Sequence, residues 1–276
     1  MRRGMSRRDF LWASALATPV VGALARNAGA QASANPGGNI LMGAQSFSFR
    51  QFGFEESIEQ LKRLGLDQME FCAVHFPPDA EHEGFEHVKQ TIEAEGIGTP
   101  CYGVEGFTAD VEANRRKFEF AKALGVQVLT ANPTSDSFDN LEELCAEFNV
   151  AIAIHNHGPG ARYDKVADTL NAVEGRHPLI GACVDTGHAI RSEETPHEVI
   201  EALGDRVISV HLKDWIHGGS EQILGKGDMD LDAVAKALKG IGFKGALMME
   251  YEESPEDPVP DMKIGWDNWM EAWERA

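Results

Sequence analysis

The residues best suited to chemistry in this chain follow an apolar run at positions 150–157, VAIAIHNH. The run ends in His155 and His157, with Asn156 between them and Gly158 behind. Side chains of a β-strand alternate between its two faces, so the two imidazoles share one face and Asn156 points to the other. A single buried histidine is commonly a core residue with a hydrogen-bond partner. Two histidines on one face at the end of a strand indicate a binding site.

Three later apolar runs, residues 179–187, 206–214 and 245–252, carry polar side chains at corresponding places. Because side chains alternate between the two faces of a strand, each of these polar side chains should share a face with the small or apolar residue two positions before it. We expect them to meet the two histidines on that face. Buried carboxylates and imidazoles must be paired or bind a metal. Mixed nitrogen and oxygen ligands favour Mn²⁺, Zn²⁺, Fe²⁺ or Co²⁺ over the hard cations Ca²⁺ and Mg²⁺. The predicted ligands are His155, Asp185, His211 and Glu250, although His157 could take the place of His155.

The elements that must position these residues repeat in a regular order from residue 40 onward. Short apolar runs alternate with amphipathic stretches whose apolar residues recur at helical spacing, such as residues 108–125 and 230–242. This alternation predicts a single (β/α)₈ barrel over residues 38–276. An open doubly wound sheet would show a glycine-rich phosphate turn after its first strand, and QSFSFRQFGF carries none. The predicted strands are 39–47, 67–73, 97–104, 126–133, 150–157, 179–187, 206–214 and 245–252.

Residues 1–32 are expected to be a targeting segment rather than part of the fold. A basic start precedes a short apolar run from Leu11 to Leu24, and small residues then offer cleavage points. SRRDFL at positions 6–11 is similar to a twin-arginine export signal, which predicts the export machinery as a partner and a periplasmic or extracellular location. An ordinary secretory signal or a membrane anchor is the alternative, but the apolar run is too short to span a membrane comfortably.

The charge and cysteine content restrict the partners further. A formal net charge of −19 over 276 residues argues against a nucleic-acid backbone as partner, because such proteins present basic surfaces. The four cysteines are far apart in sequence, and three of them fall in strand-like runs. We therefore expect buried free thiols rather than disulfides.

Four segments together carry a resemblance to a known family: VDTGH (184–188), VHLKD (210–214), ILGKGDMD (223–230) and LMMEYE (247–252). They resemble the xylose-isomerase-like barrel superfamily, which includes sugar epimerases and inosose dehydratase. The resemblance implies one divalent metal held by Glu, Asp, His and Glu from the fifth to eighth strands. Carried over, it gives Asp185, His211 and Glu250 as ligands and His188 as a substrate contact. The first glutamate of that pattern is replaced here by His155.

The resemblance also implies a reaction class. The expected activity is a metal-dependent isomerisation or epimerisation of an unphosphorylated keto sugar or polyol, through an enediolate. A lyase or dehydratase acting on 3-keto-glycosides or inosose-type substrates is the alternative, and an exported sugar-binding barrel is the non-enzymatic one. Glu250 is the predicted acid or base. Because the other glutamate is missing, the second proton carrier is His155, His157, His188 or Lys213.

Several further residues have two interpretations. His157 and His188 are expected to bind the substrate, and Tyr102 and Trp215 either wall the pocket or pack in the core or rim. Glu70 either reaches the pocket or forms a salt bridge in the barrel interior. The tryptophans at positions 266, 269 and 273 share one helical face, which predicts that the last helix docks on the barrel, a homodimer interface being the alternative.

Overall fold

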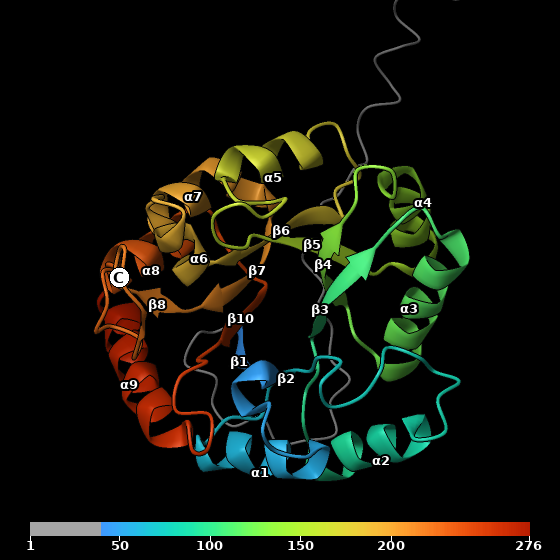
Figure 1. Ribbon diagram of the computed structural model, residues 1–276, viewed down its shortest axis with the longest axis horizontal. Helices are drawn as coiled ribbons and strands as arrows, with labels where there is room; N and C mark the ends of the chain where they lie inside the picture. The colour runs from blue at the N-terminus through green and yellow to red at the C-terminus, as the bar shows by residue number, and fades with distance from the viewer. Residues whose placement is uncertain (1–39) are drawn as a thin grey trace, which may run out of the picture.

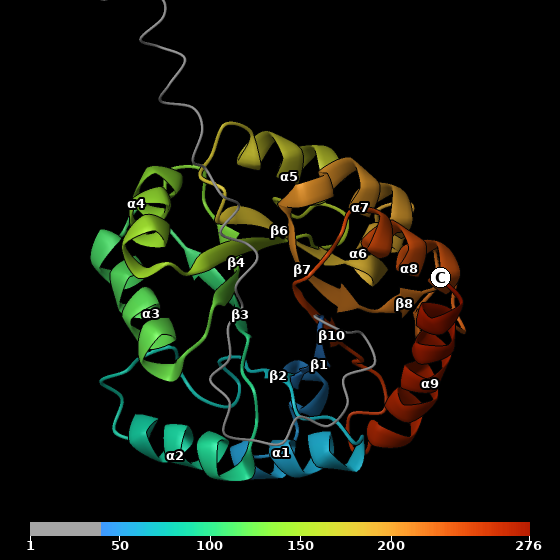
Figure 2. The ribbon, with the colours of Figure 1, turned by 180° about the vertical axis from the view of Figure 1, so that it is seen from behind.

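A ring of helices surrounds a cylinder of strands in the computed structural model, which describes residues 40–276 (Figure 1). The elements follow one another around the ring in chain order, and the same order is visible from behind (Figure 2). The barrel strands are β1 (Leu41–Gln45), β2 (Met69–Glu70), β3 (Cys101–Phe107), β4 (Val128–Pro133), β5 (Ala151–His155), β6 (Ile180–Asp185), β7 (Val207–Leu212) and β10 (Ala246–Met249).

All eight strands pair in parallel, in the order β2-β1-β10-β7-β6-β5-β4-β3. Two isolated parallel bridges, Gln68 with Gly98 and Phe71 with Tyr102, join the outer strands β2 and β3 and bring the ring nearly to closure. The predicted (β/α)₈ barrel is therefore confirmed. Such a barrel gathers the carboxyl ends of all its strands at one face, where a site can be assembled.

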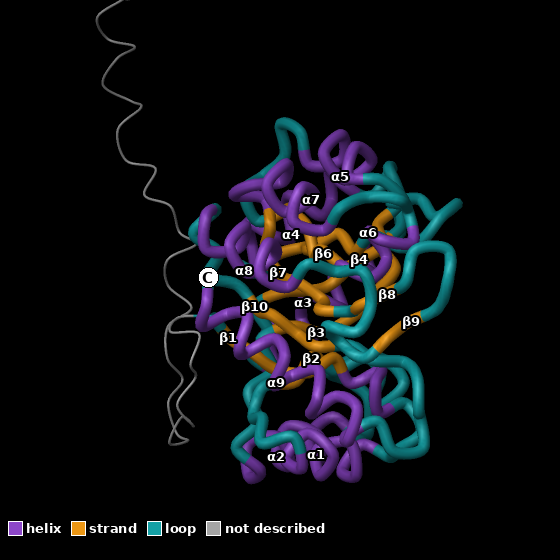
Figure 3. The backbone as a smooth tube through the Cα atoms, turned by 90° about the vertical axis from the view of Figure 1, so that its left-hand side faces the viewer, coloured by secondary structure: helices purple, strands orange, loops and turns teal. Residues whose placement is uncertain are grey.

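Nine α-helices lie within the described residues, one more than the alternation predicts. The additional helix, α6, is a short one that follows β6 directly. A small antiparallel pair, β8 (Asp214–Trp215) with β9 (Glu221–Gln222), also follows β7. Figure 3 shows this pair on the side of the barrel away from the C terminus. The helices are α1 (Phe54–Arg63), α2 (Phe85–Glu95), α3 (Val111–Leu124), α4 (Phe138–Phe148), α5 (Val166–Val173), α6 (Thr186–Arg191), α7 (Pro196–Leu203), α8 (Leu231–Gly240) and α9 (Val259–Arg275), with 3₁₀ turns η2 (Ser46–Phe49) and η3 (Gly204–Arg206).

The barrel interior is filled by small and sulfur-containing side chains. Inward positions of the strands form a separate buried cluster, while the larger apolar residues pack between strands and helices. Because these inward positions alternate with outward ones, the same alternation decides which polar residues reach the mouth. The inner cluster comprises Cys101, Val128, Ala151, Ala153, Cys183, Ala246 and Met248.

Three other expectations concern the periphery. The four cysteines are free and buried, as predicted. Trp269 is fully buried and Trp273 nearly so, which confirms that α9 docks on the barrel. The expected export signal at residues 1–32 lies outside the described residues. Within residues 40–276, no helix combines the length and apolar character that a membrane span requires.

Candidate metal centre

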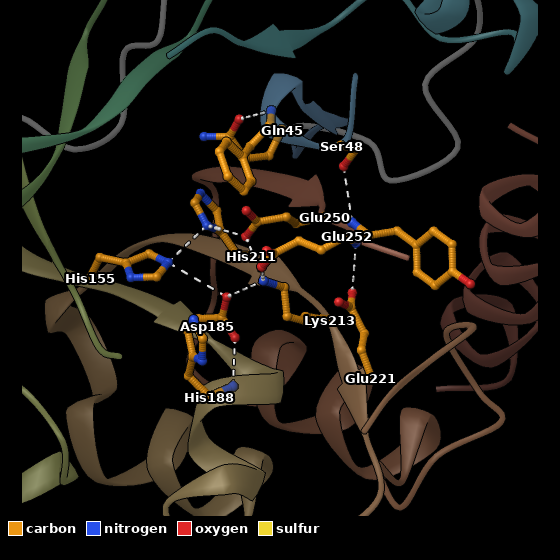
Figure 4. Close-up of polar contacts among 12 residues, drawn as sticks. Gln45, Ser48, His155, Asp185, His188, His211, Lys213, Glu221, Glu250 and Glu252 are labelled. Atoms are coloured by element: carbon orange, nitrogen blue, oxygen red, sulfur yellow. Dashed lines mark hydrogen bonds and ion pairs between the residues drawn. The ribbon is translucent and has the colours of Figure 1, made fainter. Parts of the chain in front are cut away.

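Four polar side chains converge at the carboxyl ends of β5, β6, β7 and β10 (Figure 4). His155 Nε2 lies 3.0 Å from His211 Nδ1 and 3.5 Å from Asp185 Oδ2. Glu250 Oε2 lies 3.3 Å from His211 Nδ1. One ligand atom from each residue falls within 4.8 Å of the others, and all four residues are buried. The structure thus brings together the four residues that the sequence predicts as ligands.

Strand register explains why these four residues meet. Asp185 pairs with His211, whereas His155 pairs with Cys183, two residues before Asp185. Met248 pairs with His211, and Glu250 follows Met248 by two residues. Residues two apart on a strand point to the same face, so all four side chains point into the barrel. The strands are tilted relative to the barrel axis, which brings residues that are not directly paired to the same distance along that axis.

The donor set fits a divalent cation. Asp185 Oδ2 and Glu250 Oε2 are buried and have no hydrogen-bond partner among the described residues. Unsatisfied buried carboxylate oxygens are costly unless a cation compensates them. Burial lowers the pKa of His155 to about 3 and also lowers the pKa of His157 and His188, so these imidazoles are neutral near pH 7. Two carboxylates and two imidazoles would balance the charge of a divalent ion such as Mn²⁺, Zn²⁺, Fe²⁺ or Co²⁺.

Glu70 orients His211 from the opposite side of the barrel. Its Oε2 lies 2.9 Å from His211 Nε2, and both side chains are fully buried. A carboxylate at this nitrogen holds a ring proton on Nε2 and directs Nδ1 toward the cluster, where a bound metal ion would displace any second proton. Carboxylates are common behind metal-binding histidines and raise their basicity. Of its two predicted positions, Glu70 therefore takes the salt bridge in the barrel interior, behind His211, and it does not line the pocket.

We expect Glu70→Gln to weaken metal binding while leaving the four ligands in place. A neutral amide orients His211 less firmly and polarises it less, so affinity for Zn²⁺ should fall by about 10- to 100-fold. Competition with a chromophoric chelator measures this. The matched control is Glu105→Gln, since Glu105 is a buried glutamate paired with Lys117 rather than with His211. Equal zinc affinity in Glu70→Gln and Glu105→Gln would contradict the assigned role.

Asn156, the residue between the two histidines, joins the ends of two neighbouring strands. Its Nδ2 donates to the carbonyl of Asp185 at 2.9 Å, and its Oδ1 accepts the Asp185 N–H at 2.8 Å. The end of β5 is thereby fastened to the end of β6. The Asp185 Oδ1 accepts the backbone N–H of His188 at 2.7 Å and caps α6, which leaves Oδ2 for the cluster. Asn156 is thus a positioning residue for Asp185.

Lys213 is buried among carboxylates beside the cluster. Its Nζ lies 3.3 Å from Glu250 Oε2 and 3.8 Å from Asp185 Oδ2, and it also bonds Glu252. Burial alone would lower the pKa of Lys213, but Glu250, Asp185 and Glu252 raise it above its usual value. Lys213 is therefore an ammonium that places a positive charge beside Glu250 and Asp185. A Cβ at Gly187 would come 2.6 Å from Lys213 Cγ, so a residue without a side chain is needed there.

The other predicted substrate contacts, Tyr102 excepted, lie around the cluster. His157 stacks beside His155 with ring centroids 4.5 Å apart and lies 5.5 Å from the His188 ring. It is not among the four clustered ligands. Trp215 borders a pocket of about 420 Å³, which is a suitable volume for a sugar-sized ligand. Other residues lining this pocket are Arg50, Arg191, Glu221 and Glu252.

Tyr102 does not wall the pocket, which corrects one of its two predicted roles. The side chain is fully buried, packs against Phe76 and Phe120, and donates its hydroxyl to the Phe76 carbonyl at 2.5 Å. Strand β3 begins at Cys101 rather than at residue 97, so Tyr102 lies near its start. Cys101 faces the barrel interior, and its neighbour Tyr102 consequently packs in the outer core.

Glu221 predicts a pH dependence of stability. Burial raises its pKa to about 8, despite the nearby Lys213. The folded state therefore holds a proton that the unfolded state releases once the pH exceeds the usual glutamate pKa. Its stabilising contribution is complete at acidic pH and is lost as the pH rises toward the folded-state pKa. Relative to Glu221→Gln, the wild-type free energy of unfolding should fall between about pH 5 and pH 9, by up to a few kcal/mol.

Urea unfolding of both proteins across this range measures the difference. Glu193→Gln, a change at an exposed glutamate, is the control. If the difference in free energy of unfolding between wild type and Glu221→Gln stays constant from about pH 5 to about pH 9, the raised pKa of Glu221 is contradicted.

A (β/α)₈ barrel with a His₂-carboxylate₂ cluster at its carboxyl face defines the class of this protein. The sequence profile described as "Xylose isomerase-like TIM barrel" matches residues 58–273, so the chain belongs to that family. The predicted family is confirmed.

Three individual proteins that resemble this chain share 27% of its sequence or less over the matched residues. An inosose dehydratase from Clostridium botulinum is 27% identical over 148 residues, covering 47% of this chain and 49% of that protein. A 3-oxo-isoapionate decarboxylase from Pectobacterium atrosepticum is 27% identical over 210 residues, covering 68% and 73%. A D-psicose 3-epimerase structure from Clostridium cellulolyticum H10 superposes with a TM-score of 0.69 at 13% identity, covering 85% and 99%. The chain thus spans about half the length of the inosose dehydratase, and the epimerase likeness concerns the fold.

Proposed function

We propose that this protein is a metal-dependent enzyme that enolises an unphosphorylated keto sugar or polyol-derived ketone, with isomerisation or epimerisation as the outcome. The observation that carries the proposal is the pair of buried carboxylate oxygens of Asp185 and Glu250 facing His155 and His211. Neither oxygen makes a hydrogen bond with a described residue, although the Lys213 ammonium lies 3.8 and 3.3 Å away. A divalent ion held there would act as a Lewis acid toward a substrate carbonyl. A pocket lined by Glu252, which bonds Lys213, has room for a sugar-sized molecule.

The residues of the chain divide the proton transfers between them. Glu250 Oε2 faces His211 and Lys213 and makes no hydrogen bond with a described residue, so this carboxylate is the group best placed to accept a proton. It would remove the proton from the carbon next to the carbonyl, leaving an enediolate. Lys213, 3.3 Å from the same carboxylate, supplies positive charge and a proton that can be returned. His157, a neutral imidazole stacked beside His155, is a further candidate for proton transfer.

A lyase reaction is the second candidate, and three observations favour it. A buried ammonium beside a carboxylate suits protonation of a leaving group after enolisation, and His155 stands where a second carboxylate base would be expected. In addition, two sequence relatives are named as a dehydratase and a decarboxylase, both of which release a small molecule. The two reactions share the enediolate and differ in the fate of that intermediate.

One experiment tests the shared step and separates the outcomes. The purified protein, loaded with Mn²⁺, Zn²⁺ or Co²⁺, is incubated in D₂O with ketohexoses, inososes and 3-keto-glucosides. We expect deuterium at the carbon next to the carbonyl, with a stereoisomer or positional isomer as product. A released aglycone, water or CO₂ would establish the lyase. Sugar binding without exchange for any substrate would favour a non-catalytic barrel and contradict the proposal.

We also propose that the enzyme acts after export through the twin-arginine route. The support for this is the SRRDFL segment and the short apolar run after it. Fractionation of cells that express the full-length chain tests it, and retention of the mature protein in the cytoplasm would contradict it.

A further inference from the structure

His188 has two ring nitrogens, and the structure assigns them different roles. The residue lies in the first turn of α6, and its side chain is buried, with the ring 5.7 Å from that of His155. A neutral imidazole carries one N–H donor and one acceptor, and the hydrogen bond at one nitrogen decides the chemistry of the other. The partner of Nδ1 is therefore decisive.

That partner is Arg191, at the end of the same short helix. Arg191 Nη1 lies 2.8 Å from His188 Nδ1. A guanidinium has N–H donors and no acceptor, and it stays charged at every accessible pH. Nδ1 must therefore accept, which places the ring proton on Nε2. Among the described residues, none makes a hydrogen bond with Nε2, so this N–H is available to a ligand, and its neighbour Arg191 lines the pocket that Trp215 borders.

The surroundings of Arg191 hold its guanidinium in this position. The group lies over the Trp215 ring, with its carbon 4.9 Å from the ring centroid. A Cβ at Gly158 would come within 2.7 Å of the same guanidinium carbon. Gly158, directly after the His-Asn-His segment, therefore provides the space that Arg191 occupies. The Arg191 guanidinium, which lines the pocket, therefore contacts three segments: Gly158 after β5, His188 in α6 and Trp215 in β8.

We propose that Arg191 is a positioning residue that fixes His188 as the Nε2–H tautomer, so that His188 donates a hydrogen bond to a substrate oxygen and does not act as the base. The tautomer follows from the geometry alone, whereas the substrate contact rests on the proposed function. This assignment removes His188 from the four candidates for the second proton carrier. It also requires a substrate that presents a carbonyl or hydroxyl oxygen to Nε2.

Nitrogen NMR of the full-length, ¹⁵N-histidine-labelled protein tests the tautomer directly. His188→Gln identifies the His188 signals by their disappearance. We expect a protonated-type shift at Nε2 and an unprotonated-type shift at Nδ1 at mildly alkaline pH, in the metal-free protein. In Arg191→Met, the tautomer ratio should move toward Nδ1–H by about tenfold, because a charged hydrogen bond is lost. Arg191→Lys keeps the charge and should restore part of the preference.

Arg162→Met is the matched control, since Arg162 binds the carbonyls of Asn132 and Pro133 and does not contact His188. A wild-type spectrum that places the His188 proton on Nδ1 would overturn the inference. This result does not depend on whether Arg191→Met folds. Unchanged His188 signals in a folded Arg191→Met protein would overturn it as well.

The deuterium-exchange assay separates this inference from the proposed function. With an active substrate, Arg191→Met should lower kcat by about tenfold and change KM less, because the donor acts most strongly on the developing enediolate. Absence of exchange in the wild type would refute the proposed function and leave the tautomer result standing. Exchange with equal kcat in wild type and Arg191→Met would refute the catalytic part of the inference.

Discussion

His155→Ala should lower the affinity of the protein for Zn²⁺ or Mn²⁺ by about 100-fold or more. Residues behind a metal ligand typically account for 10- to 100-fold in affinity, so loss of a ligand itself should exceed that range. His155 Nε2 is one of the four clustered ligand atoms, and the substitution also leaves His211 Nδ1 without its 3.0 Å neighbour. Isothermal titration of the metal-free protein measures the change.

His157→Ala is the matched control because it removes an imidazole two residues away on the same face. Its ring stacks on His155 but contributes no atom to the four-residue cluster. Affinity should change by less than about tenfold. A large loss in His157→Ala with normal binding in His155→Ala would assign the ligand to the other histidine.

Glu250→Gln should reduce deuterium exchange into substrate by about 1,000-fold. The substitution keeps the shape of the side chain but removes the carboxylate that accepts the proton, and general-base catalysis is commonly worth 10²- to 10⁴-fold. It also leaves Lys213 with one carboxylate fewer. Exchange is followed by proton NMR at saturating metal, so that weaker metal binding does not account for the loss.

Glu253→Gln supplies the comparison, since Glu253 lines the same pocket and makes no contact with the cluster. Its exchange rate should stay near that of the wild type. Full activity in metal-loaded Glu250→Gln would show that another group removes the proton and would contradict the role of Glu250.

Much of the fold and the four clustered residues could be predicted because both depend on local alternation. Apolar runs and amphipathic stretches predict the strand and helix order, and the two-residue period predicts which side chains face inward. Ala153, Cys183 and Met248 do lie in the inner cluster, which places His155, Asp185 and Glu250 on the same face at the strand ends. The barrel then brings these ends together.

Strand boundaries limited the prediction elsewhere. The third strand was expected at 97–104 but runs from Cys101 to Phe107, so Tyr102 lies at its beginning instead of its end. The second strand is only Met69–Glu70, which makes Glu70 its last residue and directs it to the site. The sequence pattern does not determine where strand pairing stops, because that depends on the neighbouring strands.

Contacts between distant segments could not be predicted either. Glu70 meets His211 across 141 residues of sequence, and Lys213 meets Glu252 across 39. Arg191 carries no prediction from the sequence, because the alternation of strands and helices does not predict α6, the short helix that Arg191 ends. Gly158, directly after His157, is the sequence feature that could have indicated a neighbour such as Arg191, since a glycine beside a site often makes room for another group.

Anomalous diffraction from crystals of the protein grown with Mn²⁺ or Zn²⁺ is the sharpest test of the metal centre. We expect one strong peak in contact with His155, Asp185, His211 and Glu250, with Glu70 bonded to the far nitrogen of His211. A cluster without anomalous density at saturating metal, or an ion bound through His157 in place of His155, would contradict the assigned ligand set.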